Sequence, residues 1–234
     1  FENLQAAKVE SPQIAIMIAR CHEALGRRPR AIKVLEKAET TYPKEPTVAT
    51  AVGDLHLKTR AFEDARAAYK RALAIDPAHQ PARLKIASLL VKEAKVREAI
   101  TYLQKALKEN PTGALLHVGL ADLSRQLYDT SAESTLLDDA AKGYRKALTL
   151  DPGLLAPQAN LARVLLAQAK PAEALAVLEK LEQHPNWHDD LSFELGQAKQ
   201  ALNRVDEAIG HYQKALGKNE EDARYLMAAG SAHF

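Results

Sequence analysis

One helical pattern recurs along this 234-residue chain, mostly at intervals of 34 residues. Each copy has an alanine, then Leu or Tyr four residues later, then a small or apolar residue seven residues later. The six anchoring alanines, spaced by 34, 34, 41, 34 and 34 residues, are Ala31, Ala65, Ala99, Ala140, Ala174 and Ala208. Because positions four and seven residues apart share one helix face, the pattern predicts a repeated amphipathic helix. A repeat of this length cannot bury its apolar face alone and must stack on its neighbours.

A second helix is predicted before each anchor. Twelve residues ahead of the anchor stands a small residue, such as Gly53 or Ala87, which allows two helices to approach closely; in the fourth copy the corresponding residue, Ala121, lies seven residues further back. Prolines such as Pro77 follow the anchors by twelve residues, where a helix must already have stopped. Other prolines, such as Pro46, stand where the next helix begins. Each copy is therefore expected to be a helix-turn-helix unit.

These residues resemble the tetratricopeptide repeat (TPR) family, whose 34-residue pattern is W-x2-L-G-x2-Y, then A-x3-F, then P. The matches here are Val52-Gly53, Leu195-Gly196, Ala65-x3-Tyr69, Ala208-x3-Tyr212 and Pro77, while the opening aromatic residue is missing throughout. The resemblance implies an all-α fold, a right-handed α-solenoid of helix-turn-helix TPR units. It also implies that the first helices line a concave surface where peptides bind.

We expect a single solenoid over residues 1–234. Its full units are 12–45, 46–79, 80–113, 114–154, 155–188 and 189–222, with partial units at 1–11 and 223–234. Since both ends read as incomplete units, we expect the chain to be a fragment of a longer one.

The fourth unit is longer than the others by seven residues, which fall between its helices around 128–137. Seven residues is close to two helical turns, so both helices could lengthen. Thr130 followed by Glu133 resembles a capping box and predicts that the second helix starts there. We expect this insertion to protrude from one edge of the solenoid.

The composition constrains the partners. Lysine and arginine (32) nearly balance aspartate and glutamate (30), which gives no reason to expect nucleic acid. A column of cations six residues after each anchor fits helix C-termini better than a polyanion track, because no aromatic residues interleave with it. No apolar run is long enough for a membrane span. The single Cys21 cannot form an internal disulfide, so the compartment stays open between cytoplasm and bacterial periplasm.

The sequence carries no signature of catalysis. It lacks a G-x-G-x-x-G motif, a phosphate loop and a G-x-S-x-G motif, and we predict neither an enzyme nor a cofactor. His22-Glu23 begins like a zinc-protease motif, but Gly26 stands where the second histidine is required, and no metal site is predicted. Cys21 beside His22 is interpreted as packing, since buried thiols are common and adjacent helical residues do not face one another.

The resemblance places a protein-binding groove on the first helices. Carried over by position, its residues are Arg20, Asp54, Lys58, Lys85, Lys92, Asp122, Arg125, Asn160, Arg163, Glu194 and Gln197. Two specialised grooves of the family do not match: the clamp for chaperone C-termini, and the asparagine ladder, for which only Asn160 fits. Charges of both signs along the groove favour a peptide carrying both charges.

The main functional hypothesis is a non-enzymatic scaffold that binds a peptide or protein segment in the concave groove. One alternative is an assembly module that self-associates through its end repeats or its 128–137 insertion, because an uncapped end leaves apolar surface in water. Another is the substrate-presenting TPR part of a larger enzyme or of a bacterial polysaccharide-export protein.

Overall fold

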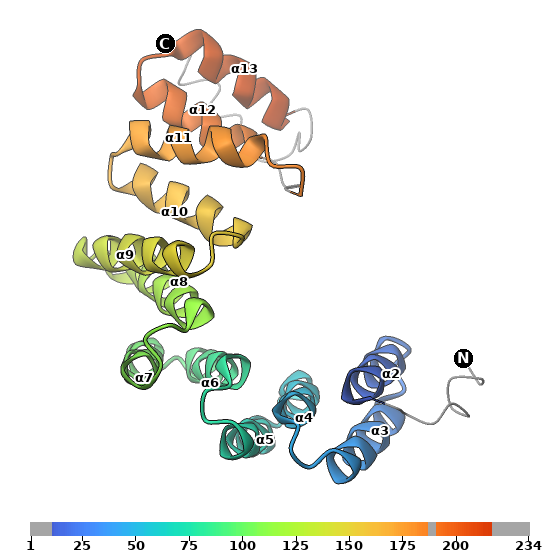
Figure 1. Cartoon of the computed structure of the whole chain (residues 1–234). Coiled ribbons are helices and arrows are strands. Elements are labelled where there is room, and N and C mark those ends of the chain that lie inside the picture. Colours follow the sequence, from blue (N-terminus) through green and yellow to red (C-terminus); the bar gives the residue numbers. More distant parts are fainter. Residues whose placement is uncertain (1–10, 187–190, 217–234) are drawn as a thin grey trace. The chain divides into compact units, whose positions relative to one another are not determined.

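The computed structural model describes residues 11–186 and 191–216, in which it has twelve helices and no strand (Figure 1). They form six consecutive helix pairs. The first helices are α2 (Pro12–Ala24), α4 (Pro46–Lys58), α6 (Gln80–Lys92), α8 (Ala114–Ser131), α10 (Leu155–Ala167) and α12 (Ser192–Ala201). The second helices are α3 (Arg28–Thr41), α5 (Phe62–Ile75), α7 (Val96–Glu109), α9 (Thr135–Leu150), α11 (Pro171–Glu182) and α13 (Val205–Leu216). The expected all-α fold of helix-turn-helix units is confirmed.

The chain divides into two compact units, Phe1–Pro111 with helices α2 to α7 and Thr112–Phe234 with helices α8 to α13. Within the first unit, α2, α4 and α6 lie along one side and α3, α5 and α7 along the other (Figure 1). A single solenoid over 1–234 stays a prediction. The expected partial units at 1–11 and 223–234 fall almost wholly outside the described residues.

Proline sets many of the helix boundaries. Helices α2, α4 and α6 carry proline in their first two positions, where the missing N–H has no intrahelical partner to lose. Helices α3, α5, α7 and α9 each end two residues before a proline. The predicted punctuation is therefore observed.

The turns inside five of the six pairs share one backbone conformation. Five residues before the anchor the chain enters the left-handed region, at φ between 56° and 70°; the residues there are Gly26, Arg60, Ala94, Ala169 and Asn203. The next N–H donates to the carbonyl five residues earlier, as from Ala61 to His56 at 3.0 Å and from Lys95 to Leu90 at 2.8 Å. This is the Schellman cap that ends a helix and reverses the chain.

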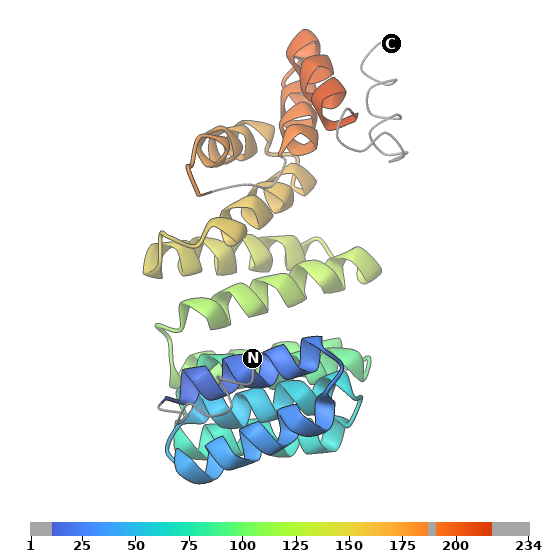
Figure 2. The same cartoon turned by 90° about the vertical axis from the view of Figure 1, so that its right-hand side faces the viewer.

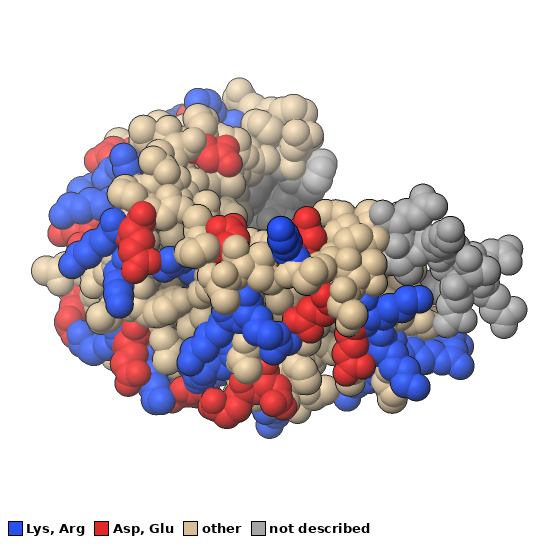
Figure 3. Space-filling model, turned by 60° about the horizontal axis from the view of Figure 1, so that its bottom comes forward, with Lys and Arg blue, Asp and Glu red and all other residues tan. Residues whose placement is uncertain are grey.

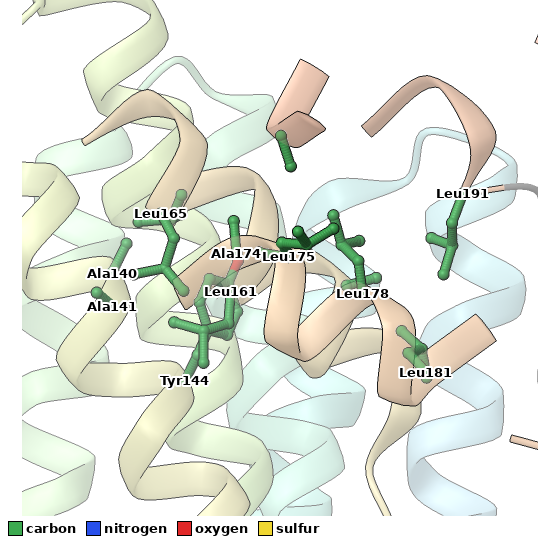
Figure 4. Close-up of a cluster of buried hydrophobic side chains, with 14 of the residues drawn as sticks. Ala140, Ala141, Tyr144, Leu161, Leu165, Ala174, Leu175, Leu178, Leu181 and Leu191 are labelled. Atoms are coloured by element: carbon green, nitrogen blue, oxygen red, sulfur yellow. The ribbon is translucent and has the colours of Figure 1, made fainter. Parts of the chain in front are cut away.

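The predicted core positions are buried in all six pairs. The anchor alanines and the residues four and seven positions after them are at most 3% exposed. Figure 4 shows Ala140 and Tyr144 of α9 beside Leu165 and Leu161 of α10, in a cluster that also includes Leu178 of α11 in the core of the second unit. Each pair thus buries one helix face against its neighbours.

In two pairs, a glycine of the first helix makes room for a tyrosine of the second. A Cβ added to Gly53 would lie 2.4 Å from Cε1 of Tyr69, and a Cβ added to Gly196 would lie 2.4 Å from the same atom of Tyr212. Where the residue four positions after the anchor is leucine, the small residue of the first helix is alanine. These combinations are Ala19 with Leu35, Ala87 with Leu103, and Ala162 with Leu178. The missing methyl group of glycine gives the tyrosine ring its space.

The fourth pair uses its seven extra residues in both helices, as expected. Helix α8 has 18 residues where most other first helices have 13, and α9 has 16 where α3, α5 and α7 have 14 (Figure 2). The predicted start of the second helix was wrong. Thr130 lies in the last turn of α8, where its hydroxyl donates to the carbonyl of Leu127, and α9 begins at Thr135. The first helix continues to Ser131 because the chain turns only at Ala132, at φ 55°.

Candidate protein-binding groove

Two adjoining cavities open among the first helices of the first unit. One, of about 490 Å³, lies mainly between α2 and α4, and the other, of about 440 Å³, extends over α2, α4 and the start of α6. Both are lined by Ile16, Arg20, Ala51, Asp54 and Lys85. We call this combined depression the α2–α4–α6 groove.

Four of the five residues predicted for this part of the groove line it. Arg20, Asp54 and Lys85 border both cavities, and Lys58 borders the larger one. Lys92 is exposed at the last position of α6 and lines neither cavity.

Asp54 is the centre of a small polar cluster. Its Oδ1 accepts a hydrogen bond from the Tyr69 hydroxyl at 2.8 Å and forms an ion pair with Nζ of Lys85 at 2.9 Å. Burial of the ring, and then the hydrogen bond to the carboxylate, raise the pKa of Tyr69 well above its ordinary value. The Tyr69 hydroxyl therefore remains a hydrogen-bond donor throughout the physiological pH range. Asp54 keeps two partners, Tyr69 and Lys85.

The other charges of this groove differ in their pairing. Lys58 Nζ lies 2.6 Å from Oε1 of Glu23 in the preceding pair. Arg20 is exposed and, among residues 11–186 and 191–216, forms neither an ion pair nor a hydrogen bond through its side chain. Arg20 is thus a guanidinium available to a partner.

In the second unit, Asp122 is hydrogen-bonded to another predicted groove residue, Asn160, and to Tyr144. Its Oδ1 accepts a hydrogen bond from the Tyr144 hydroxyl at 2.5 Å and one from Asn160 Nδ2 at 3.2 Å. Burial raises the pKa of the Asp122 carboxyl, while these two donors and Arg125 act in the opposite direction. Burial and the hydrogen bond to Asp122 raise the pKa of Tyr144.

Arg163 connects the next pair in the same unit. Its Nη1 donates to Asn160 Oδ1 at 3.2 Å, and its Nε donates to Glu194 Oε1 at 2.7 Å. Of the remaining predicted residues, Arg125 pairs within its own helix with Asp129 at 3.0 Å, and Gln197 is exposed.

One register relates these bonds. In three first helices, the residue that directly follows the small residue pairs with a residue in the first helix of the next helix pair. That partner stands two positions before the small residue of its own helix. The pairs are Asp54 with Lys85, Asp122 with Asn160, and Arg163 with Glu194. The signs of the charges vary, but the geometry repeats, so these residues connect successive helix pairs.

Sequence reasoning missed Tyr69, Tyr144 and Glu23 as partners of the groove residues. A signal for the tyrosines existed: Asp54 and Asp122, the acids directly after the small residue, occur in units that carry tyrosine four residues after the anchor. No comparable signal pointed to Glu23, because its contact with Lys58 depends on the packing of two units.

Other chemistries receive no support from the parts of the chain that the structure describes. Over those residues no three His, Cys, Asp or Glu side chains gather as metal ligands, and none of the helices is both long and apolar enough to cross a membrane. Cys21 is exposed, which corrects the expectation of a buried thiol, and His22 beside it is buried because the two residues face different sides of α2.

The column of cations on the second helices is partly neutralised. Arg71 pairs with Glu39 at 3.0 Å, and Lys214 pairs with Glu182 at 3.1 Å, each an acid of the preceding second helix. The face in Figure 3 shows basic and acidic side chains interspersed over the surface. A uniform positive track is not present on that face.

Comparisons with known proteins agree with the repeat pattern. Two family models described as tetratricopeptide repeat match, one at residues 56–123 and 165–231 and the other at 4–79. Anaphase-promoting complex subunit 7 of Arabidopsis thaliana is 27% identical over 142 residues, which is 60% of this chain and 24% of that protein. Cellulose synthase operon protein C of Pseudomonas fluorescens is 27% identical over 220 residues, 86% of this chain and 16% of that protein. The chain thus spans a quarter or less of these two relatives.

A solved structure of similar fold is that of pilF of Pseudomonas aeruginosa, at a TM-score of 0.72 and 15% identity, covering 94% of this chain and 97% of that one. TPR proteins commonly mediate protein–protein interactions, their relatives include subunits of larger complexes, and the family is generally non-enzymatic. With a family model matching more than half of its residues and with six TPR-like helix pairs, this chain belongs to the tetratricopeptide repeat family.

Proposed function

We propose that this protein is a non-enzymatic scaffold that binds a peptide or protein segment along its first helices. The observation that carries the proposal is the α2–α4–α6 groove, where two adjoining cavities of about 490 and 440 Å³ combine an apolar floor with charged walls. Cavities of this size lie in the range that binds small ligands or side chains, roughly 300–1,000 Å³. Apolar surface supports affinity, and the placed charges support the choice of partner.

The floor of this groove is built by side chains that the helix pairs do not fully bury. Ile16 and Ala51 are partly exposed, and Met17, on the exposed face of α2, is 64% exposed. A flexible methionine adapts to different apolar partners. A segment lying across α2, α4 and α6 would cover these residues.

The test measures partner binding by the full chain and by charge reversals on the first helices. A partner is captured by pull-down and identified by mass spectrometry, and its affinity is then measured by biolayer interferometry. We expect Arg20→Glu to weaken binding about tenfold, a loss typical of a charge at an interface, and Asp54→Lys to change the affinity measurably. Unchanged affinity in both of these variants would contradict the α2–α4–α6 groove, and unchanged affinity in Asp122→Lys and Arg163→Glu as well would contradict binding along the first helices.

A matched control reverses a charge on a second helix. Lys33 is exposed on α3, and Lys33→Glu changes the net charge by the same amount as Arg20→Glu. We expect its affinity to stay within about twofold of the original, because a charge away from the groove acts only over a screened distance.

A second candidate function is favoured by the similarity to cellulose synthase operon protein C over 86% of this chain. On this proposal the chain is the TPR segment of a longer protein of a bacterial polysaccharide-export system, in which it holds another component. Reading the complete gene and its neighbours tests this candidate. A neighbouring polysaccharide synthase gene would favour it, and an unrelated set of neighbours would argue against it.

A further inference from the structure

The walls of the α2–α4–α6 groove contain two carboxylates, and both are already neutralised within the protein. Glu23 is paired with Lys58 at 2.6 Å, and Asp54 is paired with Lys85 at 2.9 Å. Asp54 also accepts the hydroxyl of Tyr69. A basic side chain of a partner would have to displace these existing contacts before it found an acid.

The cations of the groove are not balanced in the same way. Three basic residues line it, Arg20, Lys58 and Lys85, against the two acids. The two lysines are in ion pairs, so the unmatched charge is the exposed guanidinium of Arg20. A guanidinium presents a planar fork of donors that fits a carboxylate through two parallel hydrogen bonds.

Arg20 stands directly beside apolar surface. It borders both cavities together with Ile16 and Ala51, and the second cavity also includes Met17. The groove therefore offers an aliphatic contact and an unpaired cation within one depression of α2, α4 and α6.

From this combination of apolar surface and an unpaired cation, we infer that the α2–α4–α6 groove selects a peptide segment of another protein. In that segment an aliphatic side chain stands next to an aspartate or glutamate. The aliphatic side chain enters the cavity beside Ile16 and Ala51, and the acidic side chain binds Arg20. The inference rests on the proposed groove function. It also revises the sequence-based expectation of a peptide with both charges, because the groove's own acids are occupied by its own lysines.

The experiment uses the full chain and a phage-displayed library of random peptides fused through their C-termini, so that acidic side chains are the carboxylates on offer. Ala51→Trp serves for counter-selection, because Ala51 is partly exposed and borders both cavities, and an indole there would fill them. Circular dichroism checks that this variant keeps its helices. Peptides retained by the original chain and lost by the variant are the groove binders.

Synthetic versions of these binders are then measured by fluorescence anisotropy. We expect Leu, Ile or Val next to Asp or Glu, an affinity loss of about tenfold on replacing the acid by lysine, and a similar loss with Arg20→Glu. Lys33→Glu, the control on α3, should change affinity by less than about twofold.

The outcomes separate this inference from the proposed function. Groove binders that are neutral or basic, or that tolerate Arg20→Glu, would overturn the acidic partner and leave the groove function standing. If Ala51→Trp displaced no peptide, both would fall. A concentration-dependent dimer in light scattering that Arg20→Glu abolished would assign the groove to a second copy of the chain and overturn the inference.

Discussion

The consecutive helix pairs α4/α5 and α6/α7 have the same backbone plan but different side chains at the point where their helices meet. In α4/α5 the ring of Tyr69 lies against Gly53, whereas α6/α7 has Ala87 and Leu103 at the corresponding positions. The Tyr69 hydroxyl donates a hydrogen bond to Asp54, and leucine has no group that could do so. In α4/α5 one buried residue, Tyr69, thus sets both the space needed between the two helices and the hydrogen-bond donor available to Asp54.

The largest expected effect comes from crowding the α4/α5 pair. In Gly53→Ala the new methyl group would lie 2.4 Å from the Tyr69 ring, which forces the helices or the ring to shift. We expect the free energy of unfolding to fall by about 1–3 kcal/mol, the usual effect of overpacking a core. Urea denaturation followed by circular dichroism measures it.

The control gives the α4/α5 pair the residues that the α6/α7 pair has at these two positions. Gly53→Ala combined with Tyr69→Leu reproduces the residues of α6/α7, so the double variant should be more stable than the sum of the two single changes predicts. Ala87→Gly should lower stability by about 1 kcal/mol, because glycine is a poor helix former. A strictly additive double variant would show that Gly53 and Tyr69 are not coupled.

A smaller effect concerns the pH dependence of stability, to which Tyr69 of α4/α5 contributes and Leu103 of α6/α7 does not. Tyr69→Phe removes the hydrogen bond to Asp54 and should lower the free energy of unfolding by about 1 kcal/mol at neutral pH. Because the folded pKa of Tyr69 is raised above its ordinary value of 10.0, the protonated phenol stabilises the fold fully below pH 10, and this contribution is lost as the pH rises above it.

Urea midpoints measured from neutral pH to above pH 10 test this difference. The stability of the original chain should fall more steeply with pH than that of Tyr69→Phe. Leu103→Met, in the pair without a tyrosine at this position, should change stability without changing the pH dependence. Identical pH profiles for the original chain and Tyr69→Phe would refute the role of the Tyr69 hydroxyl.

The smallest effects concern the turn, which the two pairs share. Arg60 and Ala94 both lie in the left-handed region, at φ 60° and 61°. This conformation costs a non-glycine residue roughly 1–2 kcal/mol, part of which glycine recovers. We expect Arg60→Gly and Ala94→Gly to raise the free energy of unfolding by similar amounts, about 0.5–1 kcal/mol, in thermal denaturation.

Gly26 occupies the same turn position in the first pair, at φ 70°. Gly26→Ala should therefore lower stability by a comparable amount. Clearly unequal effects at Arg60 and Ala94 would show that the two turns are not equivalent despite their common backbone.

The sequence predicted the helix pairs well because their signals are local. The anchor alanines and the residues four and seven positions later lie on one helix face, and all are buried. Prolines marked helix starts and stops for similarly local reasons. The capping box at Thr130 failed because the lengthened helix α8 continued through it, and a short motif alone does not fix where a longer helix ends.

The sequence alone was enough to predict the repeat, its buried face and the two helices of each repeat. Which of the polar first-helix residues are already paired is visible only in the tertiary structure. Asp54 meets Lys85 31 positions later, and Arg163 meets Glu194 31 positions later. Such contacts depend on how one helix pair is rotated on the next, a relation set by packing between units and not by periodicity within them. For that reason the available cation, Arg20, could be distinguished from Lys58 and Lys85 only once the fold was known.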